Sequence, residues 1–291
     1  MVLNLPQKST IQHLRFGFSL FLMPVFWFAL SQAPVIDWTN ACLIFIILHL
    51  LVYPSSNGYN SYMDKDTGSI GGIEKPLPVH KELFYVSVAM DFIASLLSSL
   101  LGWAILVGVG VYIIASRLYS YRGVRLKQYP VAGYLTVIIC QGALVYFIVS
   151  TGVSDVFVWK EGWLPAIVTS LLIGGTYPLT QVYQHQQDLE DGVITLSYKL
   201  GVRGTFIFCG IILFVALLLL TLYFIRVNQW WSLLAYGVAM LPVAFYFTSW
   251  FLKVAKDAGS ANFKNLMKMN YVASVCSSIA FISILIINRT G

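Results

Sequence analysis

The sequence predicts an all-α membrane protein with nine membrane-spanning helices. Of its 291 residues, 58% are hydrophobic and 10% are charged, whereas a soluble domain averages about half apolar and a quarter charged residues. Apolar stretches long enough to cross roughly 30 Å of hydrocarbon recur along the whole chain. The 18 Lys and Arg residues are also shared very unevenly between the loops.

The run from Phe84 to Ser116 is the one stretch whose division into spans is open. It is too long for one span, and a break at Leu101-Gly102-Trp103 turns it into a tight helical hairpin. A single long tilted helix there would leave eight spans. With the break, the chain 1–291 is expected to form a single membrane domain whose spans lie near residues 16–34, 39–54, 83–100, 102–117, 130–151, 162–183, 204–225, 230–251 and 268–288.

The basic residues favour nine spans over eight. With the N-terminus inside, nine spans place 15 of the 18 Lys and Arg residues in the cytoplasm and leave Lys160, Arg226 and Arg289 outside. Eight spans would scatter them over both sides. The sequence therefore predicts a multi-pass protein of a bacterial inner membrane, with the N-terminus and the loops at 55–82 and 184–203 cytoplasmic and the C-terminus outside. The apolar composition argues against a nucleic-acid partner, although the net charge is +6.

These two cytoplasmic loops suggest an internal repeat. Asp64 and Asp188 are 188 − 64 = 124 residues apart, and both follow a span that runs from outside to inside. Four spans separate these equivalent points. The sequence therefore predicts two parallel four-helix units followed by one further helix.

The first loop carries Asn60 and Asp64. In a helix, residues at i and i+4 lie on one face, so an amide oxygen and a carboxylate at this spacing can share one hard cation. Mg²⁺ prefers oxygen ligands and often bridges protein carboxylates to substrate phosphates. The alternative is a solvated loop whose acids only cap a helix.

The second loop carries Gln181, Gln184, Asp188 and Asp191 at steps of three, four and three residues. On a helix that continues out of the sixth span, this spacing forms one polar stripe. Pro178 is expected to kink that span and open space for a ligand. Such a stripe can also be a plain water-facing helix end, but two polar clusters at repeat-equivalent positions favour a shared binding site.

Basic residues near both clusters are candidates for binding a diphosphate, because Arg and Lys both bind phosphate oxygens. Lys75 follows the first cluster, and Arg125 and Lys127 lie between the fourth and fifth spans. Cytoplasmic loops also carry such residues for topology and anionic lipid alone. Asp91, about two turns into the third span, is expected to face the bundle interior, either lining a cavity or in a structural hydrogen bond.

The first cluster resembles the N-x3-D-x3-D motif of the UbiA superfamily of intramembrane aromatic prenyltransferases. Asn60 and Asp64 match its first two positions. The third falls on Gly68, which has no side-chain oxygen, so Asp66 is a displaced substitute.

The second cluster resembles the D-x3-D motif of the same family. Asp188 matches, Gln184 stands where the leading Asp is usual, and Asp191 is a compensating carboxylate. Further matches to the family pattern are Gly192, Thr195-Leu196, Tyr119-Ser120, Arg125-Leu126-Lys127, Pro130 and Lys75-Pro76.

The resemblance implies a nine-helix UbiA-like bundle and an enzyme that transfers a prenyl group from a polyprenyl diphosphate to a small aromatic acceptor within membrane lipid. It implies Mg²⁺ as cofactor, one ion at Asn60 and Asp64 and another at Asp188 with Gln184 or Asp191. Lys75, Lys127 and Arg125 would bind the diphosphate, and Tyr62 and Tyr183 would stabilise a carbocation by cation–π attraction.

Three other functions remain open from the sequence. A UbiA-like terpene cyclase would ionise the same diphosphate without an acceptor. A non-catalytic relative would have lost activity with the missing aspartates. A secondary transporter also has repeats and buried polar residues.

Overall fold

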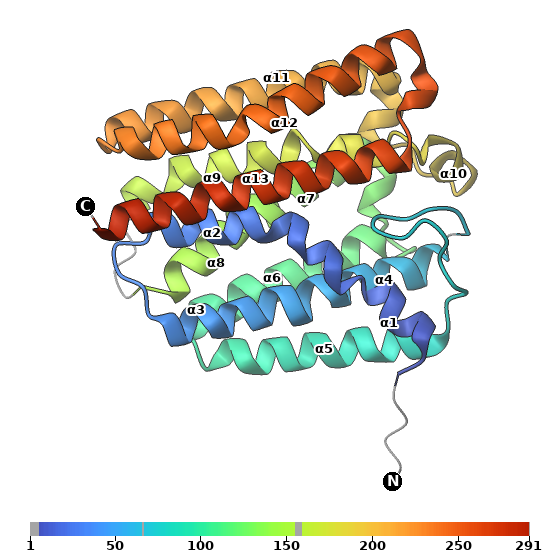
Figure 1. The fold of residues 1–291 in the computed structure, drawn as a ribbon. Coiled ribbons are helices and arrows are strands. Elements are labelled where there is room, and N and C mark those ends of the chain that lie inside the picture. Colours follow the sequence, from blue (N-terminus) through green and yellow to red (C-terminus); the bar gives the residue numbers. More distant parts are fainter. Residues whose placement is uncertain (1–5, 66, 155–158, 291) are drawn as a thin grey trace.

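The fold is a bundle of long helices that lie side by side (Figure 1). The computed structural model describes residues 6–65, 67–154 and 159–290. Within these residues there is no β-strand, and eight helical segments are long and apolar enough to cross a membrane. The described part of the chain is therefore all-helical, as the sequence predicts.

Several spans are built from consecutive helical pieces. In the first half of the chain the elements are α1 (Lys8–Leu14), the 3-10 helix η1 (Phe16–Leu22), α2 (Met23–Gln32), α3 (Trp38–Phe45), the π-helix η2 (Ile46–Val52), α4 (Tyr53–Asp64), α5 (Lys81–Ser99) and α6 (Trp103–Ser120). The predicted hairpin is present, since α5 ends before Leu101 and α6 begins at Trp103. Gly102 lies between them at φ 104°, a conformation that favours glycine.

The second half contains the 3-10 helix η3 (Leu126–Gln128), α7 (Pro130–Ile138), the π-helix η4 (Ile139–Leu144), α8 (Val145–Gly152), α9 (Trp159–Gly174), the 3-10 helix η5 (Tyr177–Gln181), α10 (His185–Glu190), α11 (Leu196–Arg226), α12 (Trp230–Lys256), the 3-10 helix η6 (Ala258–Ser260) and α13 (Phe263–Thr290). Eight of the nine predicted spans overlap the eight long segments, which extend beyond several of them. The ninth, at 162–183, falls on α9, which has 16 residues, and on η5.

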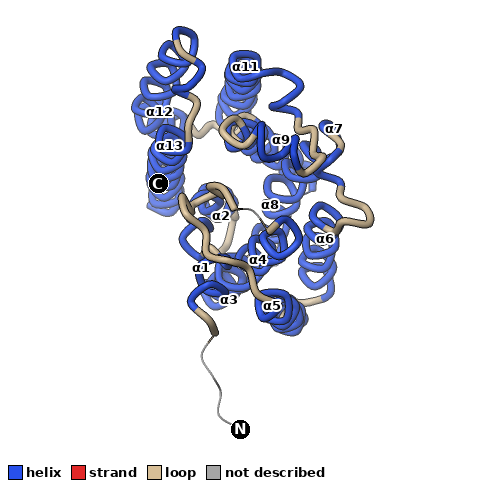
Figure 2. The backbone as a smooth tube through the Cα atoms, turned by 90° about the vertical axis from the view of Figure 1, so that its right-hand side faces the viewer, coloured by secondary structure: helices blue, strands red, loops and turns tan. Residues whose placement is uncertain are grey.

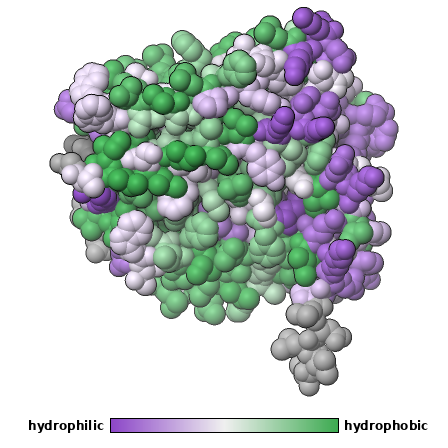
Figure 3. Space-filling model, in the orientation of Figure 1, coloured by the Kyte–Doolittle hydropathy of each residue, from purple (hydrophilic) through white to green (hydrophobic). Residues whose placement is uncertain are grey.

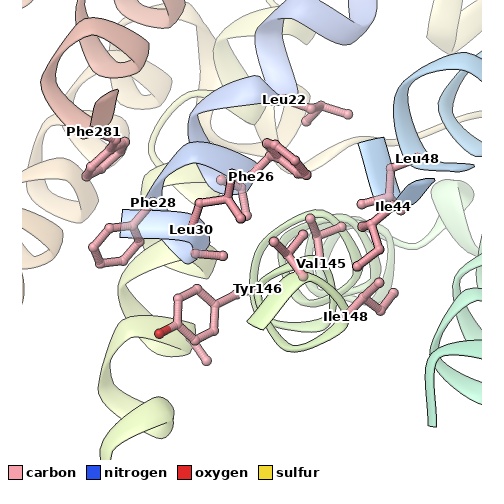
Figure 4. Close-up of a cluster of buried hydrophobic side chains, with 14 of the residues drawn as sticks. Leu22, Phe26, Phe28, Leu30, Ile44, Leu48, Val145, Tyr146, Ile148 and Phe281 are labelled. Carbon is pink, nitrogen blue, oxygen red and sulfur yellow. The ribbon is translucent and has the colours of Figure 1, made fainter. Parts of the chain in front are cut away.

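The hydrophobic core lies where α2, α8 and α13 pack together (Figure 4). Phe28 on α2 and Phe281 on α13 are fully buried, with ring centroids 4.7 Å apart. Tyr146 on α8 packs against Phe28 at 5.8 Å. These contacts join the first and last spans across the interior of the bundle.

Polar residues gather at one end of the bundle. Figure 3 shows apolar surface over most of the molecule and hydrophilic surface at the end that carries α10 in Figure 1. The loops of this end face the viewer in Figure 2. Both clusters that the sequence analysis singles out lie at this end, on α4 and around α10.

Candidate functional site

A cavity opens at the hydrophilic end of the bundle, between α4 and the segment from Tyr177 to Thr195. We call it the polar chamber. Its lining contains six of the site residues predicted from the sequence, Asn60, Asp64, Lys127, Tyr183, Gln184 and Asp188. Arg15, Phe18, Tyr119, Gln141, Tyr177 and Thr180 also line it. Residues more than 120 positions apart in the sequence thus meet at one cavity, since Asp64 and Asp188 are separated by 188 − 64 = 124 residues.

The last turn of α4 presents Asn60 and Asp64 to the polar chamber. The helix predicted around these residues is present and continues to Asp64, well past the expected end of the span at residue 54. It ends there because Lys65 takes a left-handed conformation, with φ 55°. Asn60 and Asp64 therefore lie one turn apart on the same helix. The Oδ1 atom of Asn60 accepts a hydrogen bond from the Ser120 hydroxyl at 2.8 Å.

Two basic side chains already neutralise Asp64. The Nζ atom of Lys127 lies 2.5 Å from one carboxylate oxygen, and the Nη2 atom of Arg125 lies 3.6 Å from the other. All three side chains are buried, with 4% of Asp64, 10% of Lys127 and 8% of Arg125 exposed. The segment between α6 and α7 thus places two positive charges against the single buried carboxylate of α4.

Arg125 also ties the two halves of the site together. Its guanidinium forms an ion pair with Asp191, and its Nη1 atom donates to the Asp191 carbonyl oxygen at 2.8 Å. Arg122 adds a further ion pair to Asp191, at 3.2 Å. Asp191 does not line the polar chamber. Its role in this structure is to anchor the end of α10 to the α6–α7 segment.

The predicted polar stripe on a continuous helix is wrong. The helix of the sixth span stops at Gly174, Gln181 lies in η5, and Asp188 lies on the separate short helix α10. Glycine weakens a helix by about 1 kcal/mol, and proline removes a hydrogen-bond donor, so the sequence from Gly174 to Pro178 interrupts the helix. A side chain at Gly175 would meet Leu213 at 2.5 Å, so this interruption also lets the chain pack closely on α11.

Asp188 and Gln184 still reach the polar chamber from this broken segment. The backbone N–H of Asp188 donates to the Gln184 carbonyl at 2.8 Å, which keeps the two residues one turn apart. The Gln184 side chain donates from Nε2 to the carbonyl of Ser69 at 3.0 Å. Gln184 therefore holds the loop after α4 against the second half of the site.

The space beside Gly68 is filled by α10. A Cβ atom at Gly68 would lie 2.6 Å from the Oε1 atom of Gln187. A carboxylate side chain at position 68 would therefore displace Gln187. Asp66, the other carboxylate considered for this position, lies outside the described residues.

The segment from 67 to 80 forms a cover over the polar chamber, to which it contributes Ile70 and Gly71. The N-terminal helix α1 holds this cover. Gln12 accepts from the backbone N–H of Leu77 at 2.8 Å, and a ring nitrogen of His13 lies 2.7 Å from the Leu77 carbonyl. Neither Gln12 nor His13 lines the polar chamber, so α1 holds the cover in place from outside the cavity.

A second cavity, the apolar chamber, continues from the first into the bundle. Phe18, Gln141, Tyr177 and Thr180 line both chambers. The other lining residues are mainly apolar and include Val25, Phe28, Ile173, Leu213, Met240, Val243 and Phe281. Figure 4 shows Phe28 and Phe281 facing each other in this region.

A pair of tyrosines stands where the two chambers meet. The hydroxyl groups of Tyr119 and Tyr177 hydrogen-bond to each other, and Gln181 donates to the Tyr177 hydroxyl at 2.9 Å. Both tyrosines line the polar chamber. Two rings are therefore held in place beside the passage to the apolar chamber.

His185 lies on α10 together with Asp188, but it does not line the polar chamber. Burial lowers the pKa of His185 below its usual value of 6.5, because the charged form loses hydration. A ring nitrogen lies 2.8 Å from the Ser197 hydroxyl. Its neutral ring thus joins α10 to the start of α11.

Two predicted site residues lie away from the chambers. Lys75 is exposed and lines neither cavity. The Tyr62 ring packs on Phe84, with ring centroids 5.3 Å apart. Tyr183, the other predicted aromatic residue, does line the polar chamber. The loop of Lys75 contacts α1 through Leu77, and Tyr62 lies on the face of α4 that packs against α5.

Arg15 is a chamber residue that sequence analysis did not select. Its guanidinium donates to the carbonyls of Asn57 at 3.1 Å and Gly71 at 3.3 Å. It stands between a polar N-terminal segment and the first apolar stretch, so no spacing marks it. Arg15 lies just before η1 with φ 50°, and only the folded chain brings its side chain to the chamber.

Asp91 is held in a structural ion pair. Arg117 bonds to its carboxylate, through Nε at 2.9 Å and through Nη2, and Ser55 donates to the same carboxylate. Asp91 lines neither chamber. Of the two roles that the sequence leaves open, the structure supports the hydrogen-bonded one.

The residues present fit one partly hydrated Mg²⁺ better than a site made of protein ligands alone. Among the described residues, no three His, Cys, Asp or Glu side chains gather closely enough to hold a metal ion. Mg²⁺ in phosphate-binding sites usually keeps several waters and takes one or two carboxylates plus the substrate phosphates. Asp188 can supply such a carboxylate to the polar chamber.

The sequence matches the model of the UbiA prenyltransferase family over residues 21–272. No match was found among curated proteins.

The structure is similar to solved UbiA homologues. One from Archaeoglobus fulgidus, bound to GPP and Mg²⁺, has 14% identity and a TM-score of 0.68, with 95% of this chain and 99% of that chain covered. An apo structure from Aeropyrum pernix K1 has 16% identity and a TM-score of 0.70, with 94% and 99% covered. A structure described for digeranylgeranylglyceryl phosphate synthase has 16% identity and a TM-score of 0.61, with 96% and 97% covered. These likenesses show the fold.

Proposed function

We propose, because the chain belongs to the UbiA prenyltransferase family, that it transfers a prenyl group from an isoprenoid diphosphate to a small acceptor inside the membrane. The observation that carries the proposal is the pair of connected chambers. A charged cavity with Asp64, Lys127 and Asp188 leads directly into an apolar one. This arrangement suits a substrate with an anionic head and a hydrocarbon tail.

The polar chamber supplies what a departing diphosphate needs. Lys127 lines the chamber, and Arg125 stands behind it as a fixed positive charge. Preorganised charges of this kind stabilise negative charge that develops in the transition state. Asp188, with Gln184 beside it, would hold Mg²⁺, which when bound neutralises the diphosphate leaving group.

The apolar chamber supplies a dry wall for the prenyl chain. Aliphatic and aromatic side chains exclude water, which would otherwise quench an allylic carbocation. Phe18 and Tyr177 line both chambers and are placed near the reacting carbon of a substrate that spans them. Aromatic faces there would stabilise positive charge by cation–π attraction. The proposed acceptor is a small aromatic molecule whose carbon or oxygen traps the cation.

The proposed membrane arrangement has nine crossings, with α9 and η5 making the sixth. The helix α1 lies at the hydrophilic end of the bundle and α13 ends at the opposite one, which supports an odd number of crossings (Figure 1). The positive-inside rule supports a cytoplasmic hydrophilic end and an outside C-terminus. Membrane lipid would then surround the apolar surface in Figure 3, and the bacterial inner membrane is the proposed location.

The proposal is tested by diphosphate release from the purified protein in nanodiscs. Farnesyl and geranylgeranyl diphosphate are offered with and without Mg²⁺, and with and without aromatic acceptors. We expect Mg²⁺-dependent release, lowered about 100-fold or more in D188N because the Mg²⁺ that neutralises the leaving diphosphate loses its carboxylate ligand. D37N is the matched control, since Asp37 caps α3 at the far end of the bundle and Asn caps helices equally well.

The products separate the alternatives. Release with a cyclised hydrocarbon and no need of an acceptor would indicate a terpene cyclase. No release under any condition would favour a non-catalytic relative or a transporter. Transport is already less favoured, because Asp91 is paired with Arg117 rather than facing a chamber.

A further inference from the structure

We propose that the apolar chamber binds an uncharged acceptor through a hydroxyl or carbonyl group, which is held by Asn270 and Ser274 of α13. The inference rests on the proposed function and names the chemistry of its acceptor. It is carried by a polar helix face inside a cavity whose other walls are mainly apolar.

The polar face belongs to α13. Asn270, Ser274 and Ser277 all line the apolar chamber. They are spaced by four and three residues, so they lie on one side of the helix. Phe281 also lines the chamber, one turn beyond Ser277. The same helix therefore presents hydrogen-bonding groups to one part of the chamber and an aromatic ring to another.

Asn270 lies at the end of this face that is nearer to the polar chamber. The ring of the adjoining Tyr271 packs on Phe21 of η1, with ring centroids 5.2 Å apart, and Phe21 packs on Phe18 at 5.0 Å. Phe18 lines both chambers. Phe281 is 281 − 270 = 11 residues further along α13, which is about 16 Å of helix. A group bound at Asn270 is therefore close to the junction of the chambers, where the reacting carbon is proposed to lie.

The hydrogen-bonding capacity of this face is not used within the described chain. Ser274 is 4% exposed, and its hydroxyl makes no hydrogen bond to any described residue. The Asn270 side chain likewise has no hydrogen-bond partner among the described residues. By contrast, the hydroxyls of Thr169 and Thr180, which line the same chamber, donate to backbone carbonyls at 2.8 and 2.6 Å.

A hydrocarbon tail alone would be a poor occupant of this face. It would remove water from Asn270 and Ser274 and leave two polar groups without partners, which is unfavourable. A ligand that brings its own hydroxyl or carbonyl group avoids this loss. The prenyl tail is better placed along α2, which lines the chamber with Val25 and Phe28.

The charge of the lining favours a neutral ligand. None of the described residues that line the apolar chamber is Lys, Arg, His, Asp or Glu. A carboxylate bound here would lose its hydration without gaining a cation. An amide and a hydroxyl can both donate to and accept from a neutral group. The charged lining residues, Arg15, Asp64, Lys127 and Asp188, all belong to the polar chamber, which suits the diphosphate.

The test measures the binding of small fluorinated aromatic molecules by fluorine NMR. The protein is held in nanodiscs with Mg²⁺ and farnesyl S-thiolodiphosphate, an unreactive donor analogue that occupies the polar chamber. The probe 4-fluorophenol is neutral and hydroxylated, fluorobenzene lacks the hydroxyl group, and 4-fluorobenzoate carries a charge. We expect the wild type to bind 4-fluorophenol at least about 10-fold more tightly than 4-fluorobenzoate, because the charged probe finds no cation in the apolar chamber.

Variants of α13 test the two side chains. S274A and N270L should each bind 4-fluorophenol about 3- to 10-fold more weakly, since a neutral hydrogen bond is lost, and their affinity for fluorobenzene should not fall. S274T keeps a hydroxyl group and should recover most of the affinity. S278A is the matched control, because Ser278 is on the same helix, its hydroxyl is buried without a partner among the described residues, and it lines neither chamber. Thermal melting checks that each variant is folded.

Equal affinity of the wild type, S274A and N270L for 4-fluorophenol would overturn the inference, and it would mean that water alone satisfies the two side chains. Absence of 4-fluorophenol binding, tighter binding of 4-fluorobenzoate, or an equal loss in S278A would also overturn it. Each of these results leaves the proposed function standing where Mg²⁺-dependent diphosphate release is observed. Absence of both diphosphate release and binding of the donor analogue would instead overturn the proposed function itself.

Discussion

Single residues at the far side of the apolar chamber set how much hydrocarbon it can hold. Phe18 lines both chambers, and ten further residues of 3-10 and α-helix lead to Phe28, a distance of about 17 Å. Phe281 closes on Phe28 from α13, and both rings are fully buried. In the proposed function, this aromatic pair is the wall that a longer prenyl tail would reach.

Replacing Phe281 by Leu should shift the preference of the enzyme toward longer donors. The smaller side chain opens the wall, and each additional buried CH₂ group contributes about 0.8 kcal/mol to binding. We expect the ratio of kcat/KM for geranylgeranyl over farnesyl diphosphate to rise about 5- to 10-fold. The control is F245L, because Phe245 is exposed on α12. An unchanged ratio in a folded F281L protein would show that the tail lies elsewhere.

At the scale of elements, the π-helix η4 is built around its contact with α9. A side chain at Gly142 would overlap the backbone of Ser170, so the two helices touch through a glycine. The Ser170 hydroxyl accepts a hydrogen bond from the backbone N–H of Ala143 at 3.1 Å. The adjoining Gln141 lines both chambers. This close contact therefore fixes a helix wall of the site.

Replacing Gly142 by Ala should lower the melting temperature of the protein. The added methyl group forces η4 and α9 apart, and overpacking of this kind costs about 1–3 kcal/mol. For a protein of this size, a loss of about 3–10 °C is expected. Gly110→Ala on α6 is the matched control, because a Cβ atom there meets nothing within 4 Å. Its melting temperature should stay the same or rise, since Ala favours a helix over Gly. Equal effects of the two variants would contradict the packing argument.

At the scale of the whole molecule, charge and connectivity support the proposed orientation in the membrane. The hydrophilic end carries the polar chamber, its cover and α10, whereas α13 ends at the opposite side of the bundle (Figures 1 and 3). A chain that enters at one end and leaves at the other has crossed an odd number of times. The count is nine if α9, which has 16 residues, crosses the membrane together with η5, and eight if it does not.

Tags at the two ends of the chain should be accessible from opposite sides of the membrane. In sealed cells, protease added outside is expected to remove a C-terminal tag and to leave an N-terminal tag intact. In inverted vesicles the pattern should reverse. Removal of both tags, or of neither, from the same side would mean an even number of crossings and would overturn the nine-span arrangement.

The sequence by itself determined the all-helical membrane fold, the hairpin break at Gly102 and the pairing of Asn60 with Asp64 on one face of a helix. These features are local: hydropathy decides which segments leave water, and helical spacing decides which side chains share a face. The family motifs also located both halves of the polar chamber.

Only the tertiary structure decided the partners of those residues. The binding of Asp64 to Lys127, 127 − 64 = 63 residues away, depends on how the α6–α7 segment packs over α4. The same packing attaches Asp191 to Arg125 outside the chamber, and the close packing of Gly175 on α11 is likewise visible only in the folded chain. Charge pairing acts over a few ångströms, so it is specified by three-dimensional neighbours, which the order of residues along the chain does not reveal.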